Sequence, residues 1–190
     1  HLSGDFYDYF AKEDGTICFC LGDVSGKGTS AALLMAKAIS LFRCLCKVLD
    51  DISRIVYLMN NELCETAVRG MFVTFVGGWL DPESREIRIL NVGHLPPFLM
   101  DDSKVTKIGP SSPPLGVLPE AKHPVKTFSL LDSRLYLYTD GFTEGRLKTA
   151  DRKVSGKELG LKGFLRWLAQ SNRMPLDEQV EWIQTQCRQK

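Results

Sequence analysis

The sequence has 190 residues, of which 44% are hydrophobic and 25% charged, as expected for one globular domain with a substantial core. Its formal net charge of +1 gives no argument for nucleic-acid binding through a bulk electrostatic field. The most apolar stretch, residues 31–49, is interrupted by Lys37, Arg43 and Lys47, which favours a buried helix over a membrane span. The sequence begins at His1 and not at Met, so we expect a fragment of a longer protein.

The six cysteines form no C-x-x-C motif, and no histidine pair has the spacing of zinc ligands. Cys18 and Cys20 lie in one apolar segment, and Cys44 and Cys46 lie in another. A free cysteine in such a segment acts as a small hydrophobe. Free thiols favour a reducing, cytoplasmic location.

The chain is predicted to begin with a hairpin. Its elements are a strand over Leu2–Tyr9, a turn at Asp14–Gly15 and a second strand over Thr16–Val24. The second strand is almost continuously apolar, which indicates burial on both of its faces.

Two helices are expected after the hairpin. Thr29 and Ser30 are candidate N-caps of a helix that runs to about Val48. A second helix is expected over Asp51–Thr66, where apolar residues recur at helical spacing.

From residue 71 the hydrophobic period changes from that of helices to that of strands. A hairpin is expected from strands at Met71–Leu80 and Glu86–Val92. Residues 109–119 hold four prolines and are expected to form a shaped loop. The remaining elements are expected as strands at Pro97–Met100, Val105–Ile108, Val125–Phe128 and Arg134–Tyr138, then helices near Leu161–Gln170 and Leu176–Gln189. Antiparallel strands with segregated helices indicate an α+β fold.

Two of the apolar strands end in an aspartate, Asp23 and Asp140. A carboxylate at the end of a buried strand is costly unless a cation or hydrogen-bond donors meet its charge. A third acidic pair, Asp5 and Asp8, lies in the first strand, and spacing alone does not choose between them. The pattern predicts one shared metal site with oxygen ligands and points to phosphate-ester chemistry.

The segment Gly22–Gly28 could also be a phosphate-binding P-loop or a simple glycine turn, since it follows an apolar strand and precedes a helix. A Walker loop needs four residues between its glycines, but only three separate Gly22 from Gly26. The carboxylate of Asp23 would also repel a bound phosphate. These features favour a metal ligand at Asp23, with a nucleotide-binding loop as a distant alternative.

Six segments follow one another in a specific order: Ser3–Asp8 (SGDFYD), Gly22–Gly28 (GDVSGKG), Met71–Phe75 (MFVTF), Asn91–Pro97 (NVGHLPP), Pro113–Gly116 (PPLG) and Leu137–Gly145 (LYTDGFTEG). This ordered set resembles the SpoIIE-type branch of the metal-dependent PPM serine/threonine phosphatases of bacteria. The resemblance spans Ser3 to about Glu144 and is weaker in the C-terminal helices.

The resemblance implies that residues 1–190 form a single domain, a four-layer αββα sandwich of two mainly antiparallel sheets flanked by helices. It also implies two ions of Mn²⁺ or Mg²⁺, held by Asp5, Asp23, the backbone carbonyl of Val24, and Asp140. Such paired ions would generate hydroxide and stabilise an in-line displacement at phosphorus, so no protein nucleophile is expected. Lys27 is a candidate contact for the substrate phosphate.

Three further residues lie in the matching motifs. His94 is interpreted mainly as a residue that orders its loop through hydrogen bonds, with proton transfer as the alternative. Asn91 and Thr139 are interpreted as scaffold residues.

The sequence departs from the family pattern at its end, where a strand with an Asp-Asp-x-Thr motif normally supplies a further metal ligand. We therefore expect a domain trimmed at both ends, or one with an incomplete metal site. The resemblance implies dephosphorylation of an anti-anti-sigma-type regulator, with a sensor or receiver domain upstream and no contact with nucleic acid or membrane. A degenerate phosphatase that acts as a binding module is the alternative.

Overall fold

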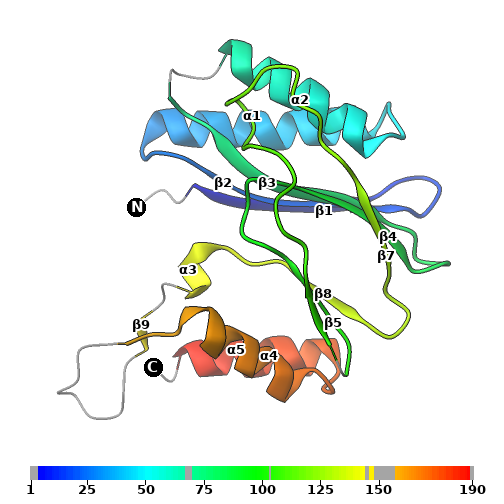
Figure 1. The fold of residues 1–190 in the computed structure, drawn as a ribbon, viewed down its shortest axis with the longest axis vertical. Coiled ribbons are helices and arrows are strands. Elements are labelled where there is room, and N and C mark those ends of the chain that lie inside the picture. Colours follow the sequence, from blue (N-terminus) through cyan, green and yellow to red (C-terminus); the bar gives the residue numbers. More distant parts are fainter. Residues whose placement is uncertain (1–3, 67–69, 103, 144–145, 148–156, 189–190) are drawn as a thin grey trace.

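A computed structural model describes residues 4–66, 70–102, 104–143, 146–147 and 157–188. Figure 1 shows four layers, with two helices, a large sheet, a smaller sheet and two further helices stacked in that order. The fold is therefore α+β with two antiparallel sheets between flanking helices, as the sequence predicts.

The large sheet has the strand order β1-β2-β3-β4-β7 and the smaller sheet the order β6-β5-β8. The strands of the large sheet are β1 (Asp5–Ala11), β2 (Ile17–Val24), β3 (Val73–Leu80), β4 (Glu86–Val92) and β7 (Lys126–Ser129). Those of the smaller sheet are β5 (Phe98–Met100), β6 (Val105–Lys107) and β8 (Arg134–Tyr136). The helices are α1 (Thr29–Cys46), α2 (Ile52–Thr66), α3 (Asp140–Thr143), α4 (Gly160–Ser171) and α5 (Leu176–Arg188), and a short strand pair comprises β9 (Arg146–Leu147) and β10 (Lys157–Glu158).

Helices α1 and α2 cover the outer face of the large sheet (Figure 1). By length and composition α1 is the one helix among the described residues that could cross a membrane. Its buried residues, from Ala31 to Cys46, pack into the main hydrophobic core against the sheet. At the centre of this core the ring of Phe42 contacts those of Phe10 and Phe75. The apolar character of α1 is therefore explained by its position in the core.

The two ends of α1 differ from the prediction. Neither Thr29 nor Ser30 is the N-cap, because the helix already begins at Thr29 and Gly28 precedes it. Gly28 has a φ of 85°, a left-handed conformation that glycine adopts without steric strain. The helix ends at Cys46, two residues before Val48. At the next helix Asp51 is a capping residue, since its carboxylate accepts hydrogen bonds from the backbone of Ser53 and Arg54.

Strand β2 is fully buried on one face and half-buried on the other, which corrects the expectation of burial on both faces. Cys18, Cys20 and Val24 are buried beneath the helices, whereas Phe19 on the opposite face is half-buried. Phe19 packs on the second core, which lies between the sheets around Val76, Ile87 and Ile89. The smaller sheet covers the large one only in part, so this face of β2 keeps some exposure.

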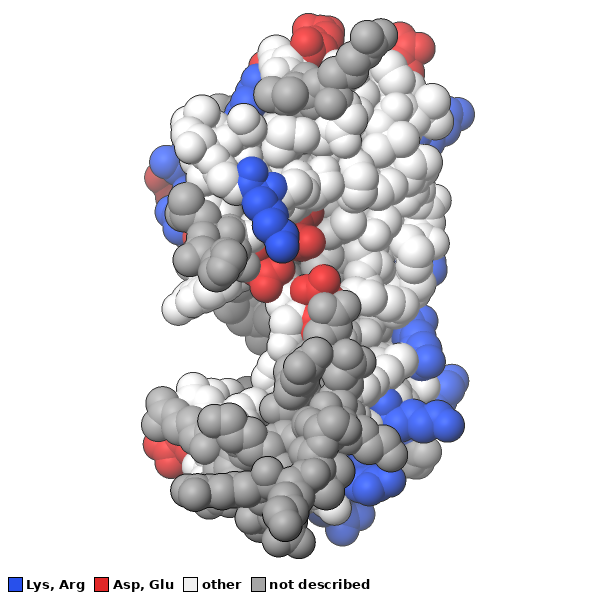
Figure 2. Space-filling view, turned by 90° about the vertical axis from the view of Figure 1, so that its left-hand side faces the viewer, with Lys and Arg blue, Asp and Glu red and all other residues white. Residues whose placement is uncertain are grey.

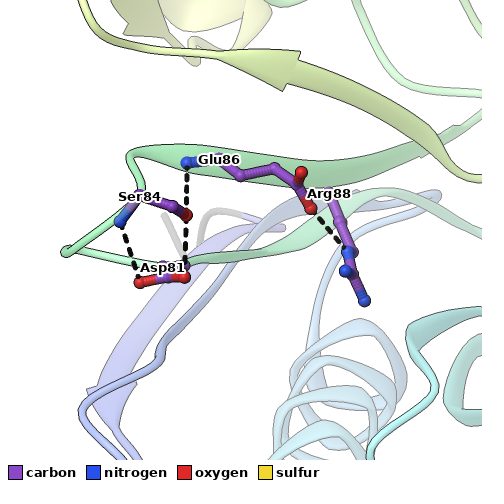
Figure 3. A network of polar contacts seen from close by, with 4 residues as sticks. All are labelled: Asp81, Ser84, Glu86 and Arg88. Carbon is purple, nitrogen blue, oxygen red and sulfur yellow. Dashed lines mark hydrogen bonds and ion pairs between the residues drawn. The ribbon is translucent and has the colours of Figure 1, made fainter.

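The hairpin turn between β3 and β4 is fixed by local hydrogen bonds (Figure 3). The Asp81 carboxylate accepts hydrogen bonds from the hydroxyl of Ser84 at 2.7 Å and from its backbone N–H at 3.3 Å. The same hydroxyl accepts one from the Glu86 backbone at 3.2 Å, and Arg88 bonds to the Glu86 carboxylate. These bonds explain why the sequence turns at residues 81–84.

A third core joins the smaller sheet to α4. The rings of Phe98 and Tyr138 stack 5.3 Å apart, and both contact Phe164 of the helix. The Tyr136 hydroxyl lies 2.9 Å from Asn172 and 3.2 Å from Gln179. The C-terminal helices thus fix the position of β8 and of the segment that follows it.

The remaining differences concern short elements and boundaries. Helix α3 and the pair β9 and β10 were not predicted from the sequence, because elements of two to four residues carry no readable period. Strand β8 ends at Tyr136, so Tyr138 lies beyond it. Four expected positions lie outside the described residues: the start of the first strand at Leu2, the last two residues of the LYTDGFTEG motif, Glu144 and Gly145, and the helix end at Gln189.

Candidate metal centre

Asp5 and Asp23 face each other across the first two strands. Their Cα atoms are register partners in the antiparallel pair β1–β2. Successive side chains of a strand alternate between its faces, and Phe6 and Val24 are buried in the core beneath the helices. Asp5 and Asp23 therefore lie on the opposite face, toward the smaller sheet. Like charges directly opposite each other destabilise a sheet unless something neutralises them.

Asp140 reaches the same place from the other sheet. It is the first residue of α3, which follows the end of β8. The preceding residue, Thr139, donates a hydrogen bond from its hydroxyl to the Asp5 carboxylate at 2.9 Å. This bond links the two sheets at one end of the sandwich. Figure 2 shows that end of the molecule, with acidic side chains gathered near the middle of the face.

The electrostatics of Asp23 reflect this convergence. Burial raises the pKa of its carboxyl above the ordinary value, and the negative charges of Asp5 and Asp140 raise it further. The backbone N–H of Val24 acts in the opposite direction. The three aspartates that the sequence singled out therefore lie close enough to interact, although they come from three separate segments of the chain.

The backbone beside the aspartates is tightly packed. A Cβ atom at Gly4 would lie 2.6 Å from both the Asp23 carboxylate and the Val24 carbonyl oxygen. Those two oxygens therefore line the same space next to Gly4, and only glycine fits there. The loop after β2 is tied down by Ser25, which exchanges hydrogen bonds with the backbone of Phe72.

The donors at this end match what a hard divalent cation takes. They comprise three carboxylates and one backbone carbonyl, and Mg²⁺ and Mn²⁺ prefer oxygen ligands. Within the described ranges no group of three or more His, Cys, Asp or Glu side chains stands close enough to hold an ion. The donor types thus suit the predicted metals, and the three carboxylates interact electrostatically, but among the described residues they do not stand close enough together to form an ion-holding group.

Asp8, left open as an alternative to Asp5, lies in a different environment. Its carboxylate forms an ion pair with Arg43 of α1. The Arg43 Nη2 atom donates to Asp8 at 2.6 Å. Asp5 and Asp8 are three positions apart on one strand, so their side chains point to opposite faces. The spacing of residues in the sequence does not reveal that Arg43 neutralises Asp8.

Lys27 lies exposed in the loop between β2 and α1.

His94 is buried beside the aspartates, with 5% of its surface exposed. Its ring nitrogens lie 2.8 Å from the Thr74 hydroxyl and 3.1 Å from the Tyr138 carbonyl oxygen. Burial lowers the pKa of His94 below its ordinary value, against the opposing effects of the Tyr138 carbonyl and of the charges of Asp5 and Asp140. The side chain of Asn91 accepts a hydrogen bond from the His94 backbone.

Sequence reasoning missed two members of this group, Thr74 and Tyr138. Both occur in matching motifs, MFVTF and LYTDGFTEG, but neither carries a charge that would single it out. Their contribution comes from the positions of a hydroxyl and a backbone carbonyl, which a sequence pattern does not report.

The chain matches a known protein family and several known proteins. The family described as Stage II sporulation protein E (SpoIIE) matches residues 13–190. The chain is 28% identical over 151 residues to the phosphoserine phosphatase RsbP of Bacillus subtilis, covering 74% of this chain and 36% of RsbP. The chain spans between 25% and 36% of the lengths of the curated relatives that it matches.

Solved structures have the same fold. The SiaA-PP2C domain of Pseudomonas aeruginosa aligns with a TM-score of 0.75 and 21% identity, covering 98% of this chain and 74% of that chain. RsbX in complex with magnesium aligns with a TM-score of 0.70 and 18% identity, covering 97% of this chain and 80% of that chain. Together with the match to residues 13–190, this likeness shows that the chain belongs to the SpoIIE family of PP2C-type (PPM) serine phosphatase domains.

Proposed function

We propose that this domain hydrolyses phosphoserine or phosphothreonine on a partner protein, with Mg²⁺ or Mn²⁺ held by Asp5, Asp23, Asp140 and the Val24 carbonyl. The observation that carries the proposal is the convergence of three carboxylates from separate segments at one end of the sandwich. The magnesium complex of the fold relative RsbX and the phosphoserine phosphatase RsbP support the metal and the substrate class.

Each residue has a separate task in this proposal. Asp5 and Asp23 bind from the large sheet, and Asp140 binds from the segment after β8. Divalent ions, when bound, lower the pKa of water and stabilise negative charge on a phosphate. Thr139 orients the Asp5 carboxylate through its hydroxyl, and Lys27, exposed in the neighbouring loop, binds the phosphate as a mobile point charge.

The proposed protein substrate rests on the likeness to the SpoIIE family. We propose a phosphorylated regulatory protein of the anti-anti-sigma type, dephosphorylated under the control of a sensor or receiver domain in the same longer protein. The relatives are about three times as long as the matched region or longer, which leaves room for such a domain in them.

The test compares two aspartates of the same strand. Hydrolysis of p-nitrophenyl phosphate and of a phosphoserine peptide is measured in Mn²⁺ for the wild type, Asp5→Asn and Asp8→Asn. Loss of a residue next to a metal commonly costs about 10–100-fold in activity, so we expect at least that loss for Asp5→Asn. Asp8→Asn, the matched control, should stay within a few-fold of the wild type. Equal rates for all three proteins would contradict the proposed site.

The binding-module alternative makes a different forecast. In that case the wild type would show no Mn²⁺-dependent turnover of either substrate, while a phosphorylated regulator would still bind. Turnover by the wild type that EDTA abolishes would exclude it.

A further inference from the structure

His94 occupies a position between the two sheets. Its loop follows β4 in the large sheet, and one ring nitrogen contacts Thr74 of β3 in the same sheet. The other ring nitrogen contacts the backbone of Tyr138, which continues from β8 of the smaller sheet. Thr74 is the register partner of Asp23, and Tyr138 precedes Asp140 by two residues. The imidazole therefore connects the neighbours of two predicted metal ligands.

The hydrogen positions follow from the chemistry of the partners. The Tyr138 carbonyl can only accept, so Nε2 of His94 carries the hydrogen and donates to it. In the neutral ring Nδ1 is then an acceptor, and the Thr74 hydroxyl donates to it at 2.8 Å, a shorter contact than its 3.3 Å approach to the Asp23 carbonyl oxygen. The Asn91 side chain also holds the backbone of His94 in place, because its Oδ1 accepts a hydrogen bond from the His94 N–H at 2.9 Å. The ring is buried, and the contacts of both of its nitrogens favour this one orientation.

We propose that His94 is a positioning residue that holds the backbone of Tyr138, and through it Asp140, at a fixed distance from Asp23. Its Nε2–H bond to the Tyr138 carbonyl is the essential contact, and the Thr74 hydroxyl keeps the ring in the correct orientation. The proposal rests on the proposed metal site for its functional meaning, because the fixed distance matters for sharing ions between Asp23 and Asp140.

The segment after β8 is short, which explains why a bond from His94 to Tyr138 is needed to hold it against the large sheet. Beyond β8 the segment forms the four-residue helix α3, and the ring of Phe142 packs on Phe164 and Trp167 of α4. These contacts tie the segment to the side of the smaller sheet and not to the large sheet. Thr139 contributes the other link across the sheets, through Asp5. Among the described residues, Thr139 would then remain as the side chain that bonds this segment to the large sheet, so without His94 the segment would move away from that sheet more often.

Two substitutions separate the two hydrogen bonds of the ring. His94→Gln places an amide nitrogen near the position of Nε2 and keeps a donor for the Tyr138 carbonyl. His94→Asn places an amide oxygen near Nδ1, keeps an acceptor for Thr74, and leaves Tyr138 without its donor. His123→Asn is the control, because His123 is also buried and bonds to Ser112 in a different part of the fold.

The first measurement is hydrogen exchange of the peptide covering residues 138–143 in metal-free protein. We expect exchange about tenfold faster in His94→Asn, close to the wild-type rate in His94→Gln, and unchanged in His123→Asn even if its melting temperature falls. Similar effects of Asn and Gln at position 94, or an acceleration spread evenly over the chain, would overturn the proposal.

The second measurement is the affinity for Mn²⁺ by calorimetry, which asks whether the position matters for the metal. Loss of supporting hydrogen bonds near a metal costs about 10–100-fold in affinity, so we expect about a tenfold loss in His94→Asn and a smaller one in His94→Gln. A wild type that binds no Mn²⁺ would refute the proposed function, while the exchange data would still decide whether His94 holds the segment.

Discussion

At the scale of single residues, Asp23 is the most informative side chain. It is half-buried, it faces Asp5 directly across a strand pair, and Asp140 is close enough to raise its pKa. A raised carboxyl pKa means that the native state binds the proton more tightly than the unfolded chain does. The free energy of unfolding therefore falls as the pH rises from the ordinary value of 3.8 through the raised native value.

This linkage gives a prediction for metal-free protein. Asp23→Asn removes the unfavourable charge, so in EDTA at neutral pH it should unfold at a higher urea concentration than the wild type. The difference should shrink as the pH falls below the raised pKa, where Asp23 of the wild type is protonated. Urea titrations between pH 4 and 8 measure it. A lower midpoint for the variant at neutral pH would show that Asp23 is already neutralised within the protein.

Asp140→Asn tests the other side of the site. The substitution keeps the size of the side chain but removes one anionic oxygen, so it should fold normally and bind Mn²⁺ more weakly. Loss of a residue that supports a metal site costs roughly 10–100-fold in activity. We therefore expect the rate of Mn²⁺-dependent hydrolysis of p-nitrophenyl phosphate to fall by at least that factor. Circular dichroism checks the fold. Asp132→Asn, an exposed aspartate in the loop before β8, is the control, and wild-type turnover by Asp140→Asn would refute its role.

At the scale of elements, the large sheet depends on close approach of its strands. A Cβ atom at Gly78 in β3 would lie 2.5 Å from the Arg88 carbonyl oxygen and 2.7 Å from the ring of Phe19. The first contact is with backbone of the paired strand β4, which cannot move without disturbing the ladder. Gly78 is therefore needed for packing and not for a special backbone angle.

The corresponding prediction is that Gly78→Ala lowers the free energy of unfolding by about 1–3 kcal/mol, the usual cost of overpacking. Gly109→Ala is the control, because a Cβ there meets no atom within 4 Å, and substitutions that disturb no packing stay within about 0.5 kcal/mol. Chemical denaturation of both variants measures the difference. Equal stability would show that β3 and β4 can separate to admit the methyl group.

At the scale of the whole molecule, the site joins parts of the chain that are far apart. Asp5 lies in the large sheet and Thr139 lies 134 positions away, after β8 of the smaller sheet, yet the two are hydrogen-bonded. The domain also depends on the core of Phe98, Tyr138 and Phe164, which holds the smaller sheet against α4. An ion shared between Asp23 and Asp140 would therefore connect the two halves of the sandwich.

We predict that Mn²⁺ stabilises the entire fold. At a free concentration of 100 times the dissociation constant, binding to the native state alone adds about 2.7 kcal/mol. Thermal denaturation with Mn²⁺ or with EDTA should show a higher midpoint in the metal, and Asp5→Asn should reduce that difference. Ca²⁺ or Mg²⁺ in place of Mn²⁺ would show how strictly the site selects its ion. Identical midpoints in Mn²⁺ and EDTA would contradict a site shared between the sheets.

The sequence by itself determined the α+β class, the order of the main elements and the two aspartates that follow apolar strands, Asp23 and Asp140, because hydrophobic period and strand-end charges are local signals. Only the tertiary structure showed that Asp8 pairs with Arg43, 35 positions away, while Asp5 lies opposite Asp23. It also revealed the contacts of His94 with Thr74 and Tyr138, which are 20 and 44 positions distant. The physical reason is that these contacts depend on long-range packing, which no local pattern encodes. Packing determines which face of a strand meets its partner and which buried donor meets which carbonyl.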